Sequence, residues 1–530
     1  MGSLKESVRM TVSSVEINGQ FQKALDGIES KKNLFITGKA GTGKSTLLNY
    51  FRQHTQRKVV VLAPTGVAAL NVQGETIHSF FGFKPDITFE KIKKLKERRA
   101  RLYQEIEAII IDEISMVRAD LLDYVDRFLR LNAKSSRLPF GGVQMILIGD
   151  LYQLPPVVIS KEKKIFETQY ESPYFFDSQL FRAHPMEMIE LEKVYRQKDQ
   201  RFIKLLNAIR NNTITEDQLQ NLNSRVGAKL APVKETDYTI HLTPTNAMAA
   251  EINAEHLSRL KEQVHTYSAL ISGRFESHAH PADEKLQMAA EAQVMLLNND
   301  SSGRWVNGTL GRVEAIEYDH ETGEDIIQVR LSNGLIEDVQ PYTWDIFHFT
   351  FNSERQIIET ETLGSFRQYP LKLAWAVTIH KSQGKTFDRV VINMGHGAFA
   401  HGQTYVALSR CRSLEGMSFV KPVQKTHIWT DWRIVRFMTR HQYEDSEQKL
   451  PLNQKLETIQ KAIESESHLD IVYLKATDDK TRRTIIPREV GPMEYQGKSF
   501  TGLAAYCLKR RDERVFRVDR ILEMKVVERK

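Results

Sequence analysis

The segment Gly38-Lys39-Ala40-Gly41-Thr42-Gly43-Lys44-Ser45-Thr46 decides the fold of the part of the chain that contains it. It fits the pattern G-x-x-x-x-G-K-[ST] in full. The apolar run 33–37 before it indicates a strand, and the run 46–51 after it indicates a helix. A strand, a glycine-rich loop and a helix N-terminus are the context in which this pattern binds nucleotide phosphates. The alternative, a glycine-rich turn with a chance lysine, does not account for this context.

The residue types of the loop predict specific roles. Glycines let the backbone curl so that its N–H groups point at phosphate oxygens, and the helix N-terminus adds partial positive charge at the same place. Lys44 is expected to reach the β- and γ-phosphates, and the Ser45 hydroxyl to bind Mg²⁺. The predicted nucleotide-binding residues of the loop are Gly38, Gly41, Thr42, Gly43, Lys44, Ser45 and Thr46.

Composition limits the remaining possibilities. A chain of 530 residues is long enough for roughly three to five domains. Lys and Arg exceed Asp and Glu by 7, which permits a nucleic-acid partner without requiring one. Two cysteines outside any paired motif argue against a disulfide framework or a zinc ribbon. The apolar runs fall far below the roughly 20 residues that span a bilayer, so we expect no membrane segment.

Further apolar runs at 59–63, 108–111 and 144–148 are separated by helical stretches, which indicates a parallel sheet covered on both faces. Ligands bind at the carboxyl ends of such strands. Asp112 is placed there to organise Mg²⁺, and Glu113 to orient or deprotonate the attacking water. Gln153, in the cluster Asp150-Leu151-Tyr152-Gln153-Leu154-Pro155-Pro156, can contact a γ-phosphate and that water. The alternative for the acidic pair is a solvated strand end.

Several motifs together make the chain resemble the Pif-one DNA helicases of helicase superfamily one, group B. They are the run Asp112-Glu113-Ile114-Ser115-Met116-Val117, the run Pro139-Phe140-Gly141-Gly142-Val143-Gln144 and the loop 149–157. The resemblance extends from about residue 20 to about residue 420. It implies an α/β fold with two RecA-like parallel-sheet lobes, at 1–190 and 191–423. It also implies a small wedge insertion at about 84–105 and a small β-barrel insertion at about 298–369.

The same resemblance implies that the second lobe completes the nucleotide site. Arg196 and Arg410 match the family's arginines that reach the γ-phosphate, a task that suits a planar and permanently charged guanidinium. A structural salt bridge is the alternative for either residue. Gln383 and Gly384, in the run Trp375-Ala376-Val377-Thr378-Ile379-His380-Lys381-Ser382-Gln383-Gly384, are expected near the nucleotide.

Other positions match the family's contacts to single-stranded DNA, and their hydroxyls, amides and rings suit sugar, phosphate and base. They are Thr65, Gly66, Thr76, His78, Phe80, Thr245, Asn246, Thr378, His380, Lys381 and Ser382. Core packing is the alternative for Phe80. The basic stretch 84–101 occupies the position of the duplex-splitting wedge, with a solvated helix face as the alternative.

The chain beyond residue 424 predicts a helical linker at 424–466 and a strand-rich module at 467–530 that resembles a WYL domain, although the tripeptide that names that family is not intact. Side chains alternate along a strand, so Arg514, Phe516 and Arg520 are expected on one face as an anion site. A basic solvated face is the alternative.

The resemblance implies an ATP- and Mg²⁺-dependent helicase that moves 5′→3′ on single-stranded DNA and unwinds forked duplexes, with G-quadruplexes or RNA–DNA hybrids as further substrates. It also implies a monomer that acts in DNA repair, recombination and telomere maintenance, here in a bacterial cytoplasm at the nucleoid. A translocase that displaces proteins and an ATP-gated regulator with a ligand-sensing tail are the alternatives.

Overall fold

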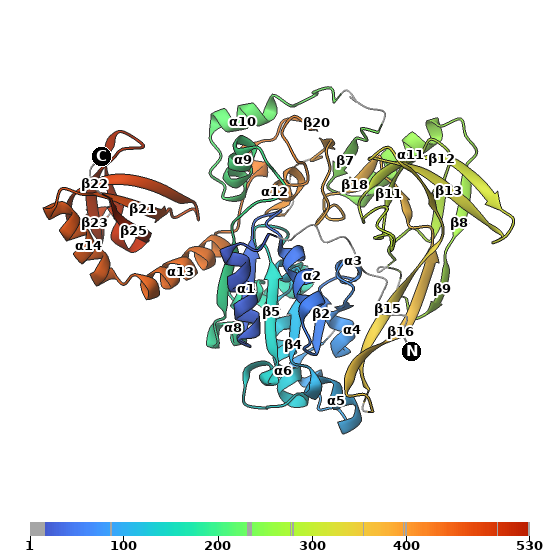
Figure 1. Ribbon diagram of the computed structural model, residues 1–530, viewed down its shortest axis with the longest axis horizontal. Helices are drawn as coiled ribbons and strands as arrows, with labels where there is room; N and C mark the ends of the chain where they lie inside the picture. The colour runs from blue at the N-terminus through green and yellow to red at the C-terminus, as the bar shows by residue number, and fades with distance from the viewer. Residues whose placement is uncertain are drawn as a thin grey trace. The chain divides into compact units, whose positions relative to one another are not determined.

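The computed structural model describes residues 16–84, 87–158, 160–230, 236–275, 277, 280–352, 354–395, 397, 400–495 and 497–527 (Figure 1). The chain divides into two compact units. The first comprises Met1–Leu206 and Glu216–Ile428, and the second comprises Asn207–Thr215 and Trp429–Lys530. No helix among the described residues is long and apolar enough to cross a membrane.

The first lobe is built on a parallel sheet in the order β3-β2-β4-β5-β1-β6. Its strands are β1 (Leu34–Gly38), β2 (Val59–Ala63), β3 (Glu75–Thr76), β4 (Ala108–Ile111), β5 (Gln144–Gly149) and β6 (Glu187–Leu191). Its helices are α1 (Gly19–Glu29), α2 (Lys44–His54), α3 (Gly66–Asn71), α4 (Ile77–Phe81), α5 (Glu97–Glu105), α6 (Ala119–Asn132), α7 (Ser160–Gln169) and α8 (Gln179–Ala183). The central strands β1, β4 and β5 are buried along their whole length, as the expected covering of both faces requires.

Alternate side chains of β1 enter two different apolar layers. Leu34 and Ile36 pack in the core that α1, α2 and α3 cover. Phe35 points the other way and meets the ring of Phe175 edge to face, with centroids 5.1 Å apart. The period-two alternation of strand side chains thus buries both faces of the sheet and fixes where its carboxyl edge lies.

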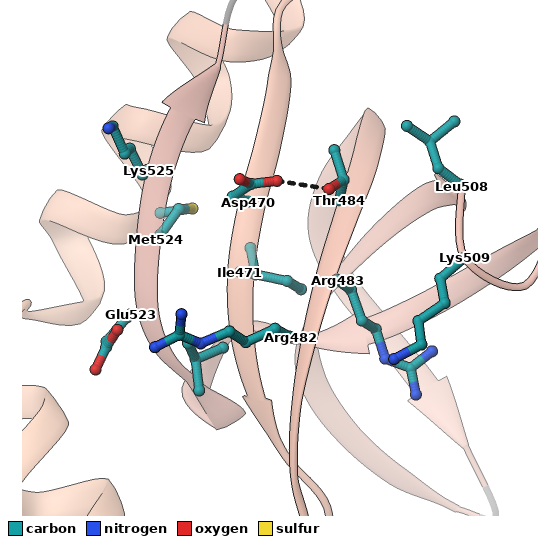
Figure 2. A pocket seen from close by; sticks show the side chains of 11 residues that line it. Asp470, Ile471, Arg482, Arg483, Thr484, Leu508, Lys509, Glu523, Met524 and Lys525 are labelled. Carbon is teal, nitrogen blue, oxygen red and sulfur yellow. Dashed lines mark hydrogen bonds between the residues drawn. The ribbon is translucent and has the colours of Figure 1, made fainter. Parts of the chain in front are cut away.

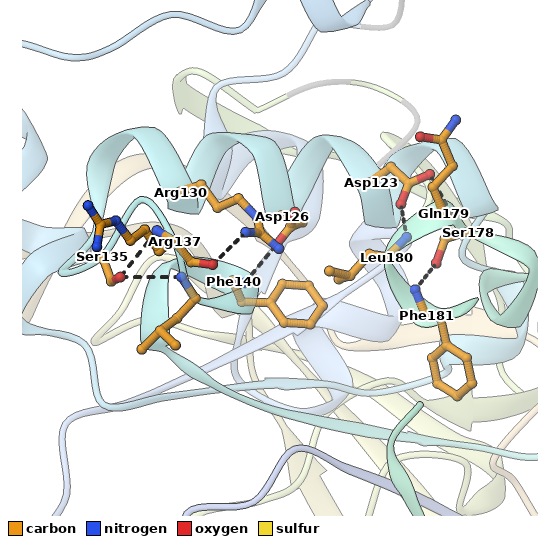
Figure 3. Close-up of polar contacts among 11 residues, drawn as sticks. Asp123, Asp126, Arg130, Ser135, Arg137, Phe140, Ser178, Gln179, Leu180 and Phe181 are labelled. Carbon is orange, nitrogen blue, oxygen red and sulfur yellow. Dashed lines mark hydrogen bonds and ion pairs between the residues drawn. The ribbon is translucent and has the colours of Figure 1, made fainter. Parts of the chain in front are cut away.

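The Pro139–Gly142 turn leads the chain into β5 and has an unusual backbone conformation (Figure 3). Phe140 and Gly141 have φ values of 51° and 65°, and a Cβ on Gly141 would lie 2.4 Å from the Leu129 carbonyl oxygen. The Asp126 carboxylate on α6 accepts a 2.6 Å hydrogen bond from the Phe140 N–H. One turn earlier, Asp123 accepts from the Leu180 N–H at the start of α8. Helix α6 therefore anchors both the turn before β5 and the start of α8.

The second lobe repeats the pattern with a shorter parallel sheet in the order β18-β7-β19-β20. Its strands are β7 (Ile240–Thr243), β18 (Ala376–Thr378), β19 (Val390–Ile392) and β20 (Met417–Phe419). Its helices are α9 (Gln200–Arg210), α10 (Glu216–Asn223), α11 (Asn246–Arg259) and α12 (Gln403–Leu408). The α/β class with two parallel-sheet lobes, as expected from the sequence, is confirmed.

A strand-rich insertion separates β7 from β18 and begins earlier in the chain than residue 298. Its strands are β8 (His265–Ser268), β9 (Leu270–Gly273), β10 (Lys285–Met288), β11 (Gln293–Leu296), β12 (Leu310–Asp319), β13 (Glu324–Leu331), β14 (Ile336–Val339), β15 (Tyr342–Asn352), β16 (Ile357–Gln368) and β17 (Leu371–Leu373). They form antiparallel sheets in the orders β14-β13-β12-β11-β17, β10-β8 and β15-β16-β9. Residues of β10 to β14 and β17 share one apolar core.

Strands β15 and β16 form a long arm that reaches the first lobe beside α4 and α5 (Figure 1). The Glu75 carboxylate on β3 is 1% exposed and accepts a hydrogen bond from the Phe349 N–H. It also lies 3.3 Å from Nδ1 of His348. The rings of Phe349 and Phe80 meet edge to face. The arm thus docks through a buried acid and an aromatic contact.

The second unit contains α13 (Trp432–Lys449), α14 (Leu452–Glu464) and an antiparallel sheet in the order β24-β23-β22-β21-β25. Its strands are β21 (His468–Leu474), β22 (Lys480–Tyr495), β23 (Lys498–Cys507), β24 (Asp512–Arg517) and β25 (Ile521–Val527). Ile459 and Ala462 of α14 lie in the core of this sheet. The helices expected at 424–466 are therefore part of the module's fold as well as a connection to it.

Candidate nucleotide and nucleic-acid sites

The phosphate loop between β1 and α2 adopts a backbone that requires glycine. Gly41 and Gly43 have φ values of 79° and 90°, a region that side chains strain to enter. A Cβ on Gly38 would lie 2.6 Å from the Leu191 carbonyl oxygen. The Lys44 ammonium donates to the carbonyl oxygens of Gly38 and Lys39, at 2.6 and 3.1 Å. The loop therefore already curls around the lysine that is expected to bind phosphate.

Asp112 and Glu113 follow β4 at the same edge of the sheet. Burial raises the pKa of Asp112, partly offset by a hydrogen bond from the Glu113 backbone and by Lys44. Burial, and then the neighbouring Asp112, raises the pKa of Glu113 to about 7. Glu113 has a φ of 52°, an uncommon value for a residue with a side chain. A partly buried pair of acids with raised pKa values, one of them in a strained backbone conformation, is typical of a catalytic site.

Arg196 from the second lobe's side lies directly over this loop. The Cβ of Arg196 is 2.5 Å from the place where a Cβ on Gly41 would stand. The Arg196 guanidinium donates to the carbonyl oxygens of Ser409 and Gly384, at 3.1 and 3.2 Å. These partners are neutral carbonyl groups, so this guanidinium contributes a net positive charge to the cleft.

Arg410 is 1% exposed and belongs to the same cluster. Burial, and then Arg196, lowers the pKa of Arg410 to about 9, while Glu113 and Asp150 act in the opposite direction. Its Nε donates to the Val406 carbonyl oxygen at 2.9 Å. A buried guanidinium with backbone partners is stabilised when an anion is bound beside it.

Gln383 joins the two lobes directly. Its side-chain amide donates to the Glu113 carboxylate at 3.0 Å and to the side-chain amide oxygen of Gln153 at 3.2 Å. Gln153 in turn donates to Asp150 at 3.3 Å. Gly384 lies beside Arg196. The residues expected to sense the nucleotide from both lobes are therefore in one hydrogen-bonded group.

Two residues of this cleft escaped the sequence analysis. The Tyr405 hydroxyl accepts a 3.0 Å hydrogen bond from the Ala40 N–H of the phosphate loop. The Gln197 amide donates to the carbonyl oxygens of Ser409 and Cys411. Gln197 directly follows the expected Arg196, and Tyr405 precedes the expected Arg410 by five residues. Only this proximity to the arginines could have indicated a role for them from sequence, because a tyrosine or a glutamine has no fixed role beside such an arginine.

The loops expected to hold a strand have the same local structure in both lobes. Thr65 follows β2 and caps α3 by accepting from the Ala68 N–H. Thr245 follows β7 and caps α11 by accepting from the Met248 N–H. Gly66 and Asn246 are the first residues of these helices, and both threonines are exposed. Each lobe therefore presents a polar helix start at the carboxyl edge of its sheet.

The remaining expected strand contacts differ in accessibility. His380 and Lys381 are exposed, and Thr76 and His78 are half-buried at the start of α4. Ser382 is fully buried and its hydroxyl donates to the Ile379 carbonyl oxygen at 2.7 Å. Thr378 is also buried, and its hydroxyl accepts from the Lys381 N–H. The last two side chains therefore shape the loop that presents His380 and Lys381.

Phe80 requires a correction. Its side chain is fully buried and packs edge to face with Phe81, Tyr103 and Phe349. A ring enclosed in this way has no face left for a base, so the core-packing alternative is the right one. The sequence did not separate the two readings because α4 is only five residues long and buries Ile77, Phe80 and Phe81 together.

The anion site expected at Arg514, Phe516 and Arg520 does not form. Phe516 is buried in the core beside the Tyr473 ring, whereas Arg514 is exposed and lies 3.8 Å from the Asp512 carboxylate. The strand ends at Arg517, and Arg520 lies in a 3₁₀ turn, Val518–Arg520. That turn breaks the strand periodicity on which the expectation rested.

A cavity of about 650 Å³ lies instead at β21, β22 and β25 (Figure 2). Cationic side chains around it are Arg482, Arg483, Lys509 and Lys525, and carboxylates are Asp470 and Glu523. Arg483 and Lys509 both line the cavity and are labelled in Figure 2, so two of its cationic groups come from β22 and from the turn after β23. The Asp470 carboxylate accepts a 2.6 Å hydrogen bond from Thr484.

The residues present in the cleft fit a nucleoside triphosphate and its metal ion. Lys44, Arg196 and Arg410 are cationic groups suited to phosphate oxygens, the carboxylates of Asp112 and Glu113 are oxygen ligands suited to a metal ion, and the loop turns sharply at Gly41 and Gly43. Two RecA-like lobes that meet at such a cleft define the class of phosphate-loop nucleoside triphosphate hydrolases.

Comparison with known proteins identifies the family to which the chain belongs. A PIF1-like helicase family model matches residues 16–220, and a WYL domain model matches residues 454–526. The ATP-dependent DNA helicase Pif1 of Bdellovibrio bacteriovorus is 34% identical over 423 residues, which cover 78% of this chain and 89% of that protein.

Two solved structures of Bacteroides sp. Pif1 are also similar. One, in complex with ADP-AlF4, is 38% identical with a TM-score of 0.73, and the match covers 81% of this chain and 98% of that chain. Another, in complex with ADP-AlF3 and ssDNA, is 38% identical with a TM-score of 0.60, over 80% and 97% of the two chains. The chain belongs to the PIF1-like helicase family and is an ATP-dependent DNA helicase.

Proposed function

We propose that this helicase uses Mg²⁺ and ATP to move 5′→3′ along single-stranded DNA and to unwind forked duplexes. The observation that carries the proposal is the shared pocket, in which Gln383 and Arg196 of the second lobe's side contact Glu113 and the Gly41 region of the first. Opening and closing such a cleft changes how two strand-binding loops lie relative to each other. Alternating grip by these loops then moves the protein along the strand.

In this proposal the charged side chains divide the chemistry. Lys44 and the loop N–H groups hold the β- and γ-phosphates, and Arg196 and Arg410 stabilise the charge that develops on the transferred phosphoryl group. Ser45 and Asp112 would hold Mg²⁺, which supplies further charge neutralisation when bound. Glu113 orients the attacking water and accepts its proton, and Gln153 positions that water.

The strand-binding part of the proposal rests on residues at the carboxyl edges of both sheets that are exposed (Thr65, Thr245, Asn246, His380 and Lys381) or half-buried (Gly66, Thr76 and His78). The similar Bacteroides protein binds ssDNA, which supports the same partner here. Exposed basic residues at 91–99 suit a wedge at the fork. We extend the proposal to G-quadruplexes and RNA–DNA hybrids as substrates, to a monomeric state and to action at a bacterial nucleoid.

A strand-displacement assay tests this function. Duplexes with a 5′ tail, a 3′ tail or both tails are incubated with the protein, with and without Mg²⁺ and ATP. We expect ATP-dependent displacement of the 5′-tailed and forked substrates only. Displacement confined to the 3′-tailed duplex would overturn the polarity, and displacement without ATP would overturn the motor.

The cavity of the second unit supports a second candidate, in which an ATP-gated regulator senses a ligand through its tail. Four cationic side chains around about 650 Å³ suit a small anionic ligand. This reading requires an ATPase rate that is indifferent to single-stranded DNA. The helicase reading requires that single strands accelerate hydrolysis, so one titration with an oligonucleotide separates them.

A further inference from the structure

Three side chains form a chain of hydrogen bonds that the proposed function does not use. The Lys385 ammonium donates to Oδ1 of Asn307, in the insertion loop between β11 and β12. Nδ2 of Asn307 donates to Oδ1 of Asn71 at 3.1 Å. Asn71 is the last residue of α3 in the first lobe. This series of hydrogen bonds therefore runs from the second lobe through its insertion to the first lobe.

The direction of each hydrogen bond follows from the lysine. An ammonium group only donates, so the oxygen of the Asn307 amide must face Lys385. The nitrogen of the same amide then faces Asn71, whose oxygen accepts. The Asn307 loop is held in place by a 2.8 Å hydrogen bond from the Asn307 N–H to Asn299. The lysine stem packs on Gly308, where an added Cβ would lie 3.2 Å from it.

The two ends of this chain lie at the two working parts of the motor. Lys385 follows Gln383 and Gly384, and its own carbonyl oxygen accepts a 3.4 Å hydrogen bond from Arg410. At the other end, α3 begins at the expected strand contacts Thr65 and Gly66. Leu70 of α3 also packs against an apolar cluster of the insertion, which independently ties this helix to the same element.

We propose that Lys385, Asn307 and Asn71 form a relay through which the nucleotide cleft and the strand-binding helix α3 sense each other. The three are positioning residues, because none of them contacts the reacting phosphate or a proposed strand contact. The relay rests on the proposed function, since it assumes that α3 holds the strand. Its role is to make ATP hydrolysis respond to bound DNA.

Aspartate substitutions test the hydrogen bond between the two asparagines. In Asn71→Asp the carboxylate still accepts from Asn307, and in Asn307→Asp the exposed amide of Asn71 can turn to donate. The double variant places two acceptors face to face and has no donor left between them. Each single variant should therefore keep the relay, and the double variant should lose it. Lys385→Met breaks the other end without adding charge.

The measurement is the ATPase rate with and without saturating oligo-dT, beside the oligo-dT Kd and the Tm of every variant. One hydrogen bond of net worth about 0.5–1.5 kcal/mol corresponds to about two- to twelvefold. We expect DNA stimulation to fall by about that factor in the double variant and in Lys385→Met. The basal rate and the Kd should stay within about twofold of wild type, and both single aspartate variants should resemble wild type.

Three results would overturn the relay: wild-type stimulation in the double variant, equal losses in the single and double variants, or a loss of stimulation that merely follows a weaker Kd or a lower Tm. A wild-type enzyme that DNA does not stimulate at all would instead refute the proposed motor. Failure of the relay and failure of the proposed function are therefore distinguishable.

Discussion

At the scale of single residues, the cleft is a set of charges whose mutual balance requires a ligand. Arg410 has its pKa lowered by burial, and Asp112 and Glu113 have theirs raised by burial. Each shift reports a charged form that the folded chain stabilises poorly. A bound nucleotide and its metal ion would add opposite charges beside these groups, so ligand binding should stabilise the first unit.

The Lys44→Ala variant tests this balance by thermal denaturation. A ligand that binds only the folded state at 100 times its Kd contributes about 2.7 kcal/mol, which raises the Tm. We expect Mg²⁺ with ADP to raise the Tm of the wild type and to leave that of Lys44→Ala nearly unchanged. The neighbouring variant Lys39→Ala is the matched control, because the substitution keeps the Lys39 backbone carbonyl that accepts from Lys44. Equal Tm shifts in Lys44→Ala and wild type would contradict the role of Lys44.

The residues expected in the nucleotide cleft lie together in the structure, whereas some of those expected to contact the strand have buried side chains. Lys44 and Glu113 stand at fixed offsets from glycine turns and strand ends, and such offsets survive folding. Phe80 and Ser382 belong to equally specific motifs, yet both side chains are fully buried in the folded protein. A motif predicts the path of the backbone, whereas the direction of each side chain depends on packing partners such as Phe349, which is distant in sequence.

At the scale of elements, the β15–β16 arm docks on the first lobe through a titratable contact. The buried Glu75 carboxylate raises the pKa of His348 by a hydrogen bond, against the effect of burial, with Glu361 adding to the rise. Cations also face the arm, since Lys58 and Arg101 lie over the Phe351 ring. Neither this contact nor the arm's length was foreseeable, because both depend on pairing between distant segments.

The pH dependence of arm docking follows from the sign of that shift. A raised folded pKa means that protonated His348 stabilises docking fully below the unfolded pKa of about 6.5, and that this contribution is lost as the pH rises through the folded value. We expect hydrogen exchange of residues 342–352, corrected for intrinsic rates, to be slower at pH 6 than at pH 8.5. The His348→Gln variant should lack this pH dependence. Equal behaviour of the variant and wild type would show that another group controls docking.

At the scale of the whole molecule, the boundary of the C-terminal unit differs from the one expected at residue 467. Helices α13 and α14 belong to this unit, and so does the segment Asn207–Thr215. Within it, the buried guanidinium of Arg210 lies 3.8 Å from the Asp478 carboxylate, and the Asn211 amide donates to the Asp478 carbonyl oxygen. A segment from the middle of the chain cannot be assigned to a C-terminal domain by sequence order.

Truncation experiments should follow the observed boundary. Ending the chain after Ile428 removes all of the C-terminal unit except Asn207–Thr215. We expect a protein that keeps DNA-stimulated ATPase activity, because the described cleft residues all precede this point. Ending it after residue 466 leaves α14 without the sheet that buries Ile459 and Ala462. That longer protein should be the more prone to aggregate. Loss of ATPase activity in a folded 1–428 protein would contradict the division.

The central claim is that a guanidinium from the second lobe completes the ATP site of the first. The most direct test is the ATPase rate of Arg410→Ala at saturating single-stranded DNA, with Arg412→Ala as the control. Arg412 is 62% exposed and pairs with Asp388. We predict a rate about 10³-fold or more below wild type for Arg410→Ala, an unchanged DNA affinity, and a nearly normal rate for Arg412→Ala. An Arg410→Ala enzyme that kept more than about a tenth of the wild-type rate would contradict the account.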